Sequence, residues 1–340
     1  MDGGRVTTAA PLPTVRPRAL TFGNVWLSLA LLAVMLLYPL VFGKSLNFGV
    51  STLIFAGLAM AWNILGGWAG QLSLGHAAFV GIGAYTLTLL AMPERVPAFF
   101  GGPVAPWWGA LLGMGLAALL AAVWGGLTFR LRGSYFTLST IAVALVLRLV
   151  AINSDWTGGA EGLFMPELPT PFGLDLFDRK VEYGLAVAFV ALTLLVTHLL
   201  RRSRLGYALQ AVREDEDGAR ALGIDPARMK LVAFMLSAAL TALGGSLYAI
   251  YLNAFEPHTL LELPVSVQIA LMAIIGGRGS IQGPVIGAIL LAAFGELFRT
   301  VFASANLLIY GVLILAVTLF APNGVMGLFQ RGGRRLGTAR

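Results

Sequence analysis

Polar side chains interrupt a glycine- and alanine-rich stretch between Gly66 and Tyr85. The segment reads GGWAGQLSLGHAAFVGIGAY, with Gln71, Ser73 and His76 close together and the tyrosine at its end. Amide, hydroxyl and imidazole groups are costly in apolar surroundings, so we expect them to face other protein groups or a water-filled path. Hydrogen bonds between helices are the alternative explanation. A lone histidine is more typical of a structural partner than of a metal ligand or a proton relay.

A second polar group follows in RLRGSYFTLSTIA, which spans residues 130–142. Thr137 and Thr140 are candidates for lining the same path. Serine and threonine in helices also donate hydrogen bonds to carbonyl groups of their own helix, and this interpretation stays open. Arg148 lies further along, where it can extend to the membrane surface or pair with Asp155; binding of a substrate is the less favoured third interpretation.

The most charged segment spans residues 201–230 and reads RRSRLGYALQAVREDEDGARALGIDPARMK. It holds twelve charged residues, although charged residues make up only 11% of the chain. Within it, four apolar residues recur at the spacing of one helix face and predict a short amphipathic helix. These residues are Leu205, Ala208, Leu209 and Val212.

Local signals divide the charged segment into two helices. Gly223 suits a left-handed residue that ends a helix, and Asp225 followed by Pro226 suits the start of the next one. Two helices that meet at a sharp turn form a shape suited to docking onto another protein. The alternative is a solvated loop whose charges only orient the neighbouring helices.

The sequence lacks the residues that common catalytic and metal sites require. It contains no cysteine and only three scattered histidines, so disulfides and metal sites are not expected. No G-x-x-x-x-G-K-[ST], H-E-x-x-H or G-x-S-x-G string occurs. We therefore expect no enzyme activity and no cofactor bound by this chain.

The composition predicts an all-α polytopic membrane protein. Hydrophobic residues make up 58% of the 340 residues, and apolar runs near twenty residues recur along the chain. Lipid cannot satisfy backbone N–H and C=O groups, so these runs must be helices. The net charge of +7 is best explained by basic cytoplasmic loops, and nucleic-acid binding is not expected.

About ten transmembrane helices are predicted, with eight or nine as open alternatives. The expected spans are roughly 24–42, 46–65, 72–92, 105–129, 134–152, 181–200, 231–252, 263–277, 283–298 and 306–322. The eighth and ninth spans are the weakest because they are short. The eighth could be broken or partly re-entrant.

The distribution of basic residues predicts the orientation. Ten spans place both termini and the charged segment on one side, which then holds 17 of the 23 Lys and Arg residues. By the positive-inside rule this side is cytoplasmic. The domain organisation is then a cytoplasmic N-terminal segment (1–22), a transmembrane domain (23–322) that includes the cytoplasmic loop 201–230, and a basic cytoplasmic tail (323–340).

Three glycines at four-residue spacing predict close helix packing. Gly279, Gly283 and Gly287 form a G-x-x-x-G-x-x-x-G series in GSIQGPVIG. This spacing places them near one helix face, where small residues let two backbones approach.

Three segments of the chain resemble one known family. They are GQLSLGHAAFVGIGAY (70–85), RLRGSYFTLSTIA with the later TGGAEGL (130–142 and 157–163), and the block 203–287 with SRLGYALQAVREDEDGARALGID and IGGRGSIQGPVIGA. The chain is similar to permease subunits of branched-chain amino acid ABC importers, specifically the LivM type. The resemblance in character covers roughly residues 46–298.

This resemblance implies a set of partners and a location. The chain would pair with a second, LivH-like permease, and two ABC ATPase subunits would bind ATP and Mg and drive the pair. A periplasmic binding protein would deliver the substrate to this multi-pass protein of the bacterial inner membrane. Related permeases carry urea, short amides or other amino acids, which the motifs do not separate. A stand-alone channel or facilitator is the alternative from another class.

The resemblance also implies that the charged segment is the family's coupling helix, which docks onto an ATPase. Ala219 and Gly223 match the small-residue positions of the family's loop, whereas Glu214 and Asp215 only approximate its acidic start. The usual E-A-A triplet does not occur. The residues expected to carry ATPase coupling are Arg204, Gly206, Glu214, Asp215, Ala219, Leu222 and Gly223.

Overall fold

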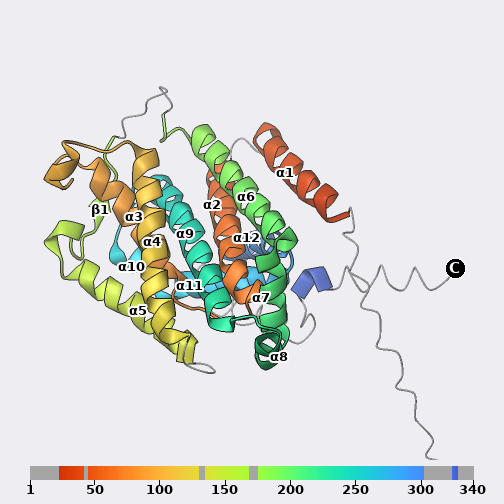
Figure 1. The fold of residues 1–340 in the computed structure, drawn as a ribbon. Helices are drawn as coiled ribbons and strands as arrows, with labels where there is room; N and C mark the ends of the chain where they lie inside the picture. Colours follow the sequence, from red (N-terminus) through yellow and green to blue (C-terminus); the bar gives the residue numbers. More distant parts are fainter. Residues whose placement is uncertain (1–22, 42–44, 130–134, 168–174, 302–323, 328–340) are drawn as a thin grey trace, which may run out of the picture.

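The computed structural model describes residues 23–41, 45–129, 135–167, 175–301 and 324–327, and these residues are almost entirely helical (Figure 1). The longer helices are α1 (Gly23–Val41), α2 (Leu46–Asn63), α3 (His76–Ala91), α4 (Pro106–Thr128), α5 (Tyr135–Ile152), α6 (Arg179–Arg202), α9 (Pro226–Leu252), α11 (Leu263–Gly276) and α12 (Gly283–Val301). Shorter helices are η2 (Ile64–Trp68), η3 (Ala98–Phe100), η4 (Asp155–Thr157), α7 (Arg204–Glu214), α8 (Glu216–Ala221) and α10 (Pro257–Leu260). Strands β1 (Leu163–Phe164) and β2 (Ala254–Phe255) pair antiparallel.

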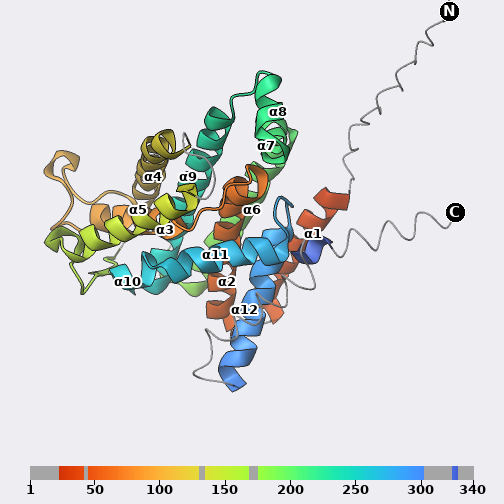
Figure 2. The same cartoon turned by 90° about the horizontal axis from the view of Figure 1, so that it is seen from below.

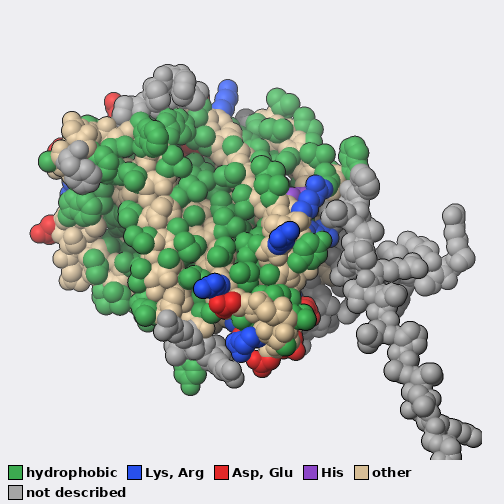
Figure 3. All heavy atoms as spheres, in the orientation of Figure 1, with side chains coloured by type: hydrophobic (Ala, Val, Ile, Leu, Met, Phe, Trp, Pro, Cys, Tyr) green, Lys and Arg blue, Asp and Glu red, His purple; other side chains and the backbone are tan. Residues whose placement is uncertain are grey.

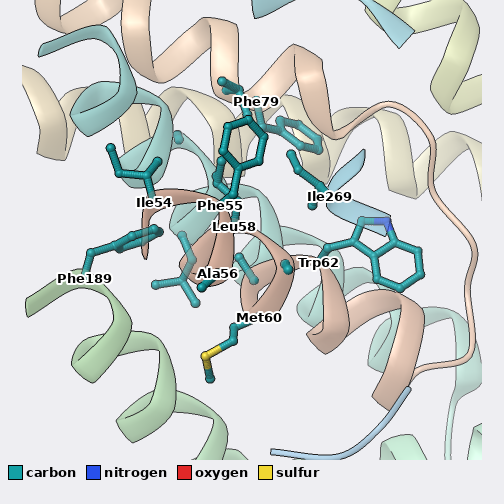
Figure 4. Close-up of a cluster of buried hydrophobic side chains, with 14 of the residues drawn as sticks. Ile54, Phe55, Ala56, Leu58, Met60, Trp62, Phe79, Phe189 and Ile269 are labelled. Atoms are coloured by element: carbon teal, nitrogen blue, oxygen red, sulfur yellow. The ribbon is translucent and has the colours of Figure 1, made fainter. Parts of the chain in front are cut away.

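Helix α2 is the centre of the bundle. It packs against α6, α9, α11 and α12, and most of its residues are buried. Figure 4 shows Leu58, Met60 and Trp62 of this helix among side chains from its neighbours, including Phe189 of α6 and Ile269 of α11. The helix is buried on all sides, and this explains why its sequence from residue 46 to residue 62 has no polar face.

Small residues allow the helices to approach closely. A Cβ added to Gly83 in α3 would lie far inside contact distance of the Ala242 carbonyl group in α9. A Cβ added to Gly245 in α9 would collide with the backbone of Val80 in α3 in the same way. The α3–α9 contact is therefore a backbone-to-backbone contact, which only glycine permits at these two positions.

Among the described residues, six helical segments are long and apolar enough to cross a membrane. They are residues 46–68, 106–128, 135–152, 179–202, 226–252 and 257–276. Three shorter apolar helices cover residues 25–40, 76–91 and 283–297. On one broad face, hydrophobic side chains of α4 and its neighbours cover the surface, while charged side chains gather near α7 and α8 (Figure 3). A polytopic membrane protein has this surface because its flanks contact lipid.

The helices lie close to the first nine predicted spans. Helix α11 is continuous over the predicted eighth span, and the separate short helix α10 precedes it. Helix α11 packs against α2, α3 and α12 (Figure 2). The tenth predicted span, 306–322, lies outside the described residues, as do the N-terminal segment 1–22 and most of the tail.

The start of the third predicted span is wrong by four residues. Helix α2 continues into the π-helical turn η2, an irregular segment follows, and α3 begins only at His76 instead of Leu72. Bonds from distant parts of the chain hold the irregular segment. The Trp62 indole donates to the Ser73 carbonyl oxygen (2.7 Å). Tertiary hydrogen bonds have therefore overridden the local helical preference.

Loops that are distant in sequence meet at opposite ends of the bundle (Figure 1). At one end, Leu163 pairs with Phe255 in the β1–β2 ladder, and Arg95 donates to the carbonyl oxygen of Asp155 (2.7 Å). At the other end, α7 and α8 connect α6 to α9. Contacts between loops thus close the first end of the bundle, and the short helices α7 and α8 lie at the other end.

Candidate functional site

A chain of hydrogen bonds surrounds His76 at the break between η2 and α3. Its Nδ1 lies 3.0 Å from the Ser73 hydroxyl, and its Nε2 lies 2.9 Å from the Ser237 hydroxyl of α9. The Ser237 hydroxyl in turn donates to the Ala61 carbonyl oxygen (2.7 Å). The three polar side chains are fully buried. The chain of bonds therefore links α2, the irregular segment, α3 and α9.

The direction of these bonds assigns the tautomer of His76. The Ser237 hydroxyl donates its proton to the hydrogen bond with the Ala61 carbonyl oxygen, so its oxygen must accept a hydrogen bond from the imidazole Nε2–H. Nδ1 then accepts from the Ser73 hydroxyl. The ring packs against the aromatic rings of Trp62 and Phe79. A neutral imidazole satisfies every partner in this arrangement.

Hydroxyl groups from other helices hold the irregular segment before α3. Thr137 of α5 donates to the Leu72 carbonyl oxygen (2.8 Å), and Thr140 accepts from the Leu74 backbone N–H (3.2 Å). Thr140 also donates to the carbonyl oxygen of Thr137 within its own helix (2.8 Å). Ser266 of α11 accepts from the backbone N–H of the residue after His76 (2.8 Å). These bonds satisfy backbone groups that a helix start leaves unpaired.

The structure brings most of the candidate path residues together. Ser73, His76, Thr137 and Thr140 meet around the irregular segment, and half-buried Gln71 lies within that segment. Tyr85 is separate because it lies nine residues further along α3, about 14 Å at the helical rise.

Tyr85 differs from Ser73, His76, Thr137 and Thr140 because its polar group has no partner among the described residues. Its ring packs edge-on against Phe255, and its buried hydroxyl has no hydrogen-bond partner among the described residues. A buried hydroxyl is normally paired, so this group is available to a water molecule or a solute.

A small cavity lies between α3, α4, α5 and α9. Thr140 contributes to its wall, whereas Ser73, His76 and Tyr85 do not. The lining residues are Gly75, Ala78, Phe79, Leu120, Trp124, Thr140, Val143 and Phe234. The hydroxyl network thus fixes a segment beside this apolar cavity, and Thr140 is the member of the network that lines it.

The charged segment contains three helices instead of the predicted two, because the chain turns at Asp215 between α7 and α8. The Ser203 hydroxyl accepts from the Gly206 N–H (3.1 Å) at the start of α7, and Asp215 accepts from Asp217 N–H (3.0 Å) at the start of α8. Asp225 caps α9 by accepting from two backbone N–H groups. Side-chain caps at all three helix starts fix the sharp turns between α7, α8 and α9.

The end of α8 follows the predicted left-handed cap. Gly223 has φ +82°, its N–H bonds to the Arg220 carbonyl oxygen, and the Ile224 N–H bonds to the Ala219 carbonyl oxygen. These two bonds form a Schellman motif, which ends a helix sharply. No heavy atom lies within 4 Å of the position that a Cβ on Gly223 would take.

The candidate coupling residues divide between a buried and an exposed group. Gly206 is buried against the end of α6, and Ala219 is buried on the inner side of α8. The others are exposed, and they are Arg204, Glu214, Asp215, Leu222 and Gly223. On this otherwise polar surface, Tyr207 is 67% exposed and Leu222 is 80% exposed. Sequence reasoning missed Tyr207, although its place opposite the apolar stripe of α7 could have identified it.

An ion pair attaches α8 to α9. The Lys230 ammonium group pairs with the Glu216 carboxylate, and the lysine is buried. A buried ammonium group needs such a partner, so this pair orients α8 over the start of α9.

The three spaced glycines do not share one helix face. Gly283 and Gly287 lie in α12, where an added Cβ would collide with Gly276 at the end of α11. Gly279 precedes the helix, in the turn between α11 and α12, with φ +75°. The prediction is therefore wrong for Gly279, because the chain reverses there before α12 begins.

At the opposite end of the bundle, Arg148 does not pair with Asp155. Its guanidinium group lies 2.8 Å from His258 Nδ1 and 3.5 Å from the Glu262 carboxylate. This surface cluster joins α5, α10 and α11. Among the described residues, no group of three or more His, Cys, Asp or Glu side chains could hold a metal ion.

Comparison with known proteins identifies related transport proteins. The profile of a family described as "Branched-chain amino acid transport system / permease component" matches residues 44–320. The chain is 30% identical over 325 residues to the high-affinity branched-chain amino acid transport system permease protein LivM of Salmonella typhimurium, covering 88% of this chain and 74% of that protein. It is also 30% identical to LivM of Escherichia coli K12, covering 87% and 73%.

A second group of relatives carries the name LivH. The LivH permease protein of Salmonella typhimurium is 27% identical over 177 residues, which is 52% of this chain and 53% of that protein. Comparison with solved structures gave no significant match. The family profile spans most of the transmembrane region described above. The chain therefore belongs to the permease component family of branched-chain amino acid transport systems.

Proposed function

We propose that this chain is one of two different permease subunits of an ATP-driven importer for branched-chain amino acids. A LivH-like permease forms the other half of the translocation path. Two ABC ATPase subunits bind ATP and Mg on the cytoplasmic side, and a periplasmic binding protein delivers the substrate. The family match and the LivM and LivH relatives support this assignment.

We infer cytoplasmic termini in the bacterial inner membrane from the excess of basic residues on the side of residues 201–230, and the loop contacts support the counted alternation of sides. Counting spans assigns residues 66–71, 201–230 and 277–282 to one side, and contacts connect all three segments. The same count assigns β1 and β2 to the outer side, and they pair with each other. Ten spans agree with this alternation, with the tenth in residues 306–322.

The observation that carries the proposal is the exposed surface of α7 and α8. Its polar side chains surround Tyr207 and Leu222, two large apolar side chains that face outward. A loop that only orients neighbouring helices has no need of exposed apolar anchors. Protein interfaces, in contrast, use aromatic and apolar side chains within a polar rim. We infer that this surface docks onto an ATPase subunit.

The mechanism follows from rigid docking. ATP binding brings the two ATPase subunits together, and the docked α7 and α8 move with them. Helices α6 and α9 are joined to this element by short capped turns, so their tilt changes and the path opens to one side at a time. The free energy comes from the different affinities of the ATPases for the two arrangements.

We further propose that the segment before α3 borders the translocation path. In this proposal Gln71 lies at the edge of the path. The shape of the segment is held by Ser73, His76, Thr137 and Thr140. The unpaired hydroxyl of Tyr85 is available to a solute.

Co-purification and uptake competition test the function. Expressed with its candidate partners, the tagged chain should co-purify with two ATPase chains and one LivH-like permease. Proteoliposomes that contain the complex and the binding protein should import leucine, and isoleucine and valine should compete. Assembly of the chain alone or with itself would favour a channel. Competition by urea or amides, but not by valine, would change the substrate class.

A further inference from the structure

Arg213, in the last turn of α7, reaches into the end of α2. Its guanidinium group donates to the carbonyl oxygen of Gly67 in η2. The last carbonyl groups of a helix lack partners within the helix, and a cationic donor there is favoured by the helix dipole. This side chain therefore connects the charged segment directly to the central helix of the bundle.

Asn63 extends this contact to the turn between α11 and α12. Its side-chain oxygen accepts from the Gly279 backbone N–H (2.9 Å), and its amide nitrogen donates to the Ser280 carbonyl oxygen (2.8 Å). Asn63 is 1% exposed. Two hydrogen bonds from one buried amide fix the turn to α2 with a defined orientation.

Glycines leave the space that the Arg213 side chain occupies. A Cβ added to Gly70 would lie 3.0 Å from its Cγ, and one added to Gly279 would contact its guanidinium nitrogen at 2.5 Å. A Cβ on Gly67 would collide with Asn63 and with the Gly279 backbone. Three segments from different parts of the chain thus converge on one arginine.

We propose that Arg213 is a positioning residue that transmits the movement of α7 to the end of α2 and to the α11–α12 turn. The inference rests on the proposed function, in which α7 docks onto an ATPase. The segment next to Gly67 continues through Gly70 to His76 at the start of α3. Arg213 therefore transmits a shift of α7 to the segment that borders the translocation path. This route does not involve α6 or α9.

Substitution of Arg213 in the assembled importer tests the proposal. Arg213→Gln removes the charge and the forked donor of a side chain that is itself exposed, and it leaves the other exposed α7 residues in place for docking. We expect ATP hydrolysis to continue and uptake per ATP hydrolysed to fall about 2- to 30-fold, the range of residues that couple distant sites. Uptake per ATP hydrolysed should fall less in Arg213→Lys, because an ammonium group can still donate to the Gly67 carbonyl oxygen.

Arg228→Gln is the matched control. Arg228 lies on the same side of the protein, its side chain is 82% exposed, and it pairs only with the nearby Asp225 carboxylate. Its loss should leave uptake per ATP unchanged. Wild-type coupling in assembled Arg213→Gln complexes would overturn the inference, whereas failure of the wild-type chain to bind ATPases would refute the proposed function instead.

A disulfide provides a test that does not depend on loss of function. The chain has no cysteine, and a Cβ on Gly70 would lie 3.5 Å from the Cβ of Arg213, within the range of disulfide geometry. In the double variant Gly70→Cys/Arg213→Cys, the reduced protein should be uncoupled and oxidation should restore uptake per ATP. In the single variant Gly70→Cys, neither the reductant nor the oxidant should change uptake per ATP. An oxidised pair that remains uncoupled would overturn the inference.

Discussion

Gly206→Ala should displace α7 from the end of α6 and uncouple the importer. An alanine Cβ would lie 2.9 Å from the Leu200 carbonyl carbon and closer still to its oxygen, whereas real Cβ atoms essentially never approach within 3.0 Å. The corner between the helices must open by on the order of 1 Å, because the packed backbone cannot absorb the methyl group. Overpacking of this kind costs about 1–3 kcal/mol.

The same substitution weakens the start of α7. Opening the corner stretches the hydrogen bond from Gly206 N–H to the Ser203 hydroxyl, and loss of a cap costs about 1 kcal/mol. The two terms add to about 2–4 kcal/mol, which lowers the population of correctly placed α7 by at least about 30-fold. We expect uptake per ATP hydrolysed to fall by a comparable factor.

The assay measures leucine uptake and phosphate release in the same proteoliposomes. Gly184→Ala is the control, because Gly184 lies in α6 and no heavy atom lies within 4 Å of its Cβ position. This control should couple normally. Normal coupling by Gly206→Ala, with the complex intact, would show that the position of α7 does not determine transport and would refute the reasoning.

Three further substitutions separate docking from packing. Gly223→Leu should leave membrane insertion intact, because its side chain meets open space outside the bundle. It should uncouple ATP hydrolysis from uptake, both by covering the docking surface and by straining the left-handed residue that ends α8. Ser237→Ala should lower the free energy of unfolding by about 0.6–2 kcal/mol in detergent–SDS titrations, since it leaves His76 Nε2–H unpaired. Gly83→Ala should cost about 1–3 kcal/mol in the same titration, because its Cβ would collide with the Ala242 carbonyl group.

Matched controls make these results interpretable. Gly115→Ala adds a methyl group where no heavy atom lies within 4 Å, so it should be neutral or stabilising. Ser139→Ala removes a hydroxyl that bonds only to its own helix at the Phe136 carbonyl oxygen, so it should also be close to neutral. These controls could also lower the free energy of unfolding as much as Gly83→Ala and Ser237→Ala do. That result would show that neither the backbone collision nor the lost hydrogen bond explains the loss of stability.

The sequence predicted most helices and the turns of the charged segment, because their signals are local. Long apolar runs specify helices wherever lipid surrounds the backbone. Gly223 and the pair Asp225–Pro226 predicted one helix end and the next helix start, and both were confirmed. Each of these features depends on residues within a few positions of one another.

The contacts that define the site could not be predicted in the same way. The start of α3 depends on Thr140 and Trp62, which bond to the irregular segment from other helices. Arg213 and its acceptor Gly67 are 146 positions apart, and Asn63 and Ser280 are 217 positions apart. No spacing rule connects such pairs, because folding of the whole bundle brings them together.

ATP-dependent leucine uptake by the reconstituted importer tests the central claim most directly. The measurement uses proteoliposomes that contain this chain, a LivH-like permease, two ATPase subunits and the binding protein. We expect uptake that requires ATP and stops when the ATPases are inactivated or when this chain is omitted. Leucine uptake by this chain alone, at the same rate with or without ATP, would contradict the central claim.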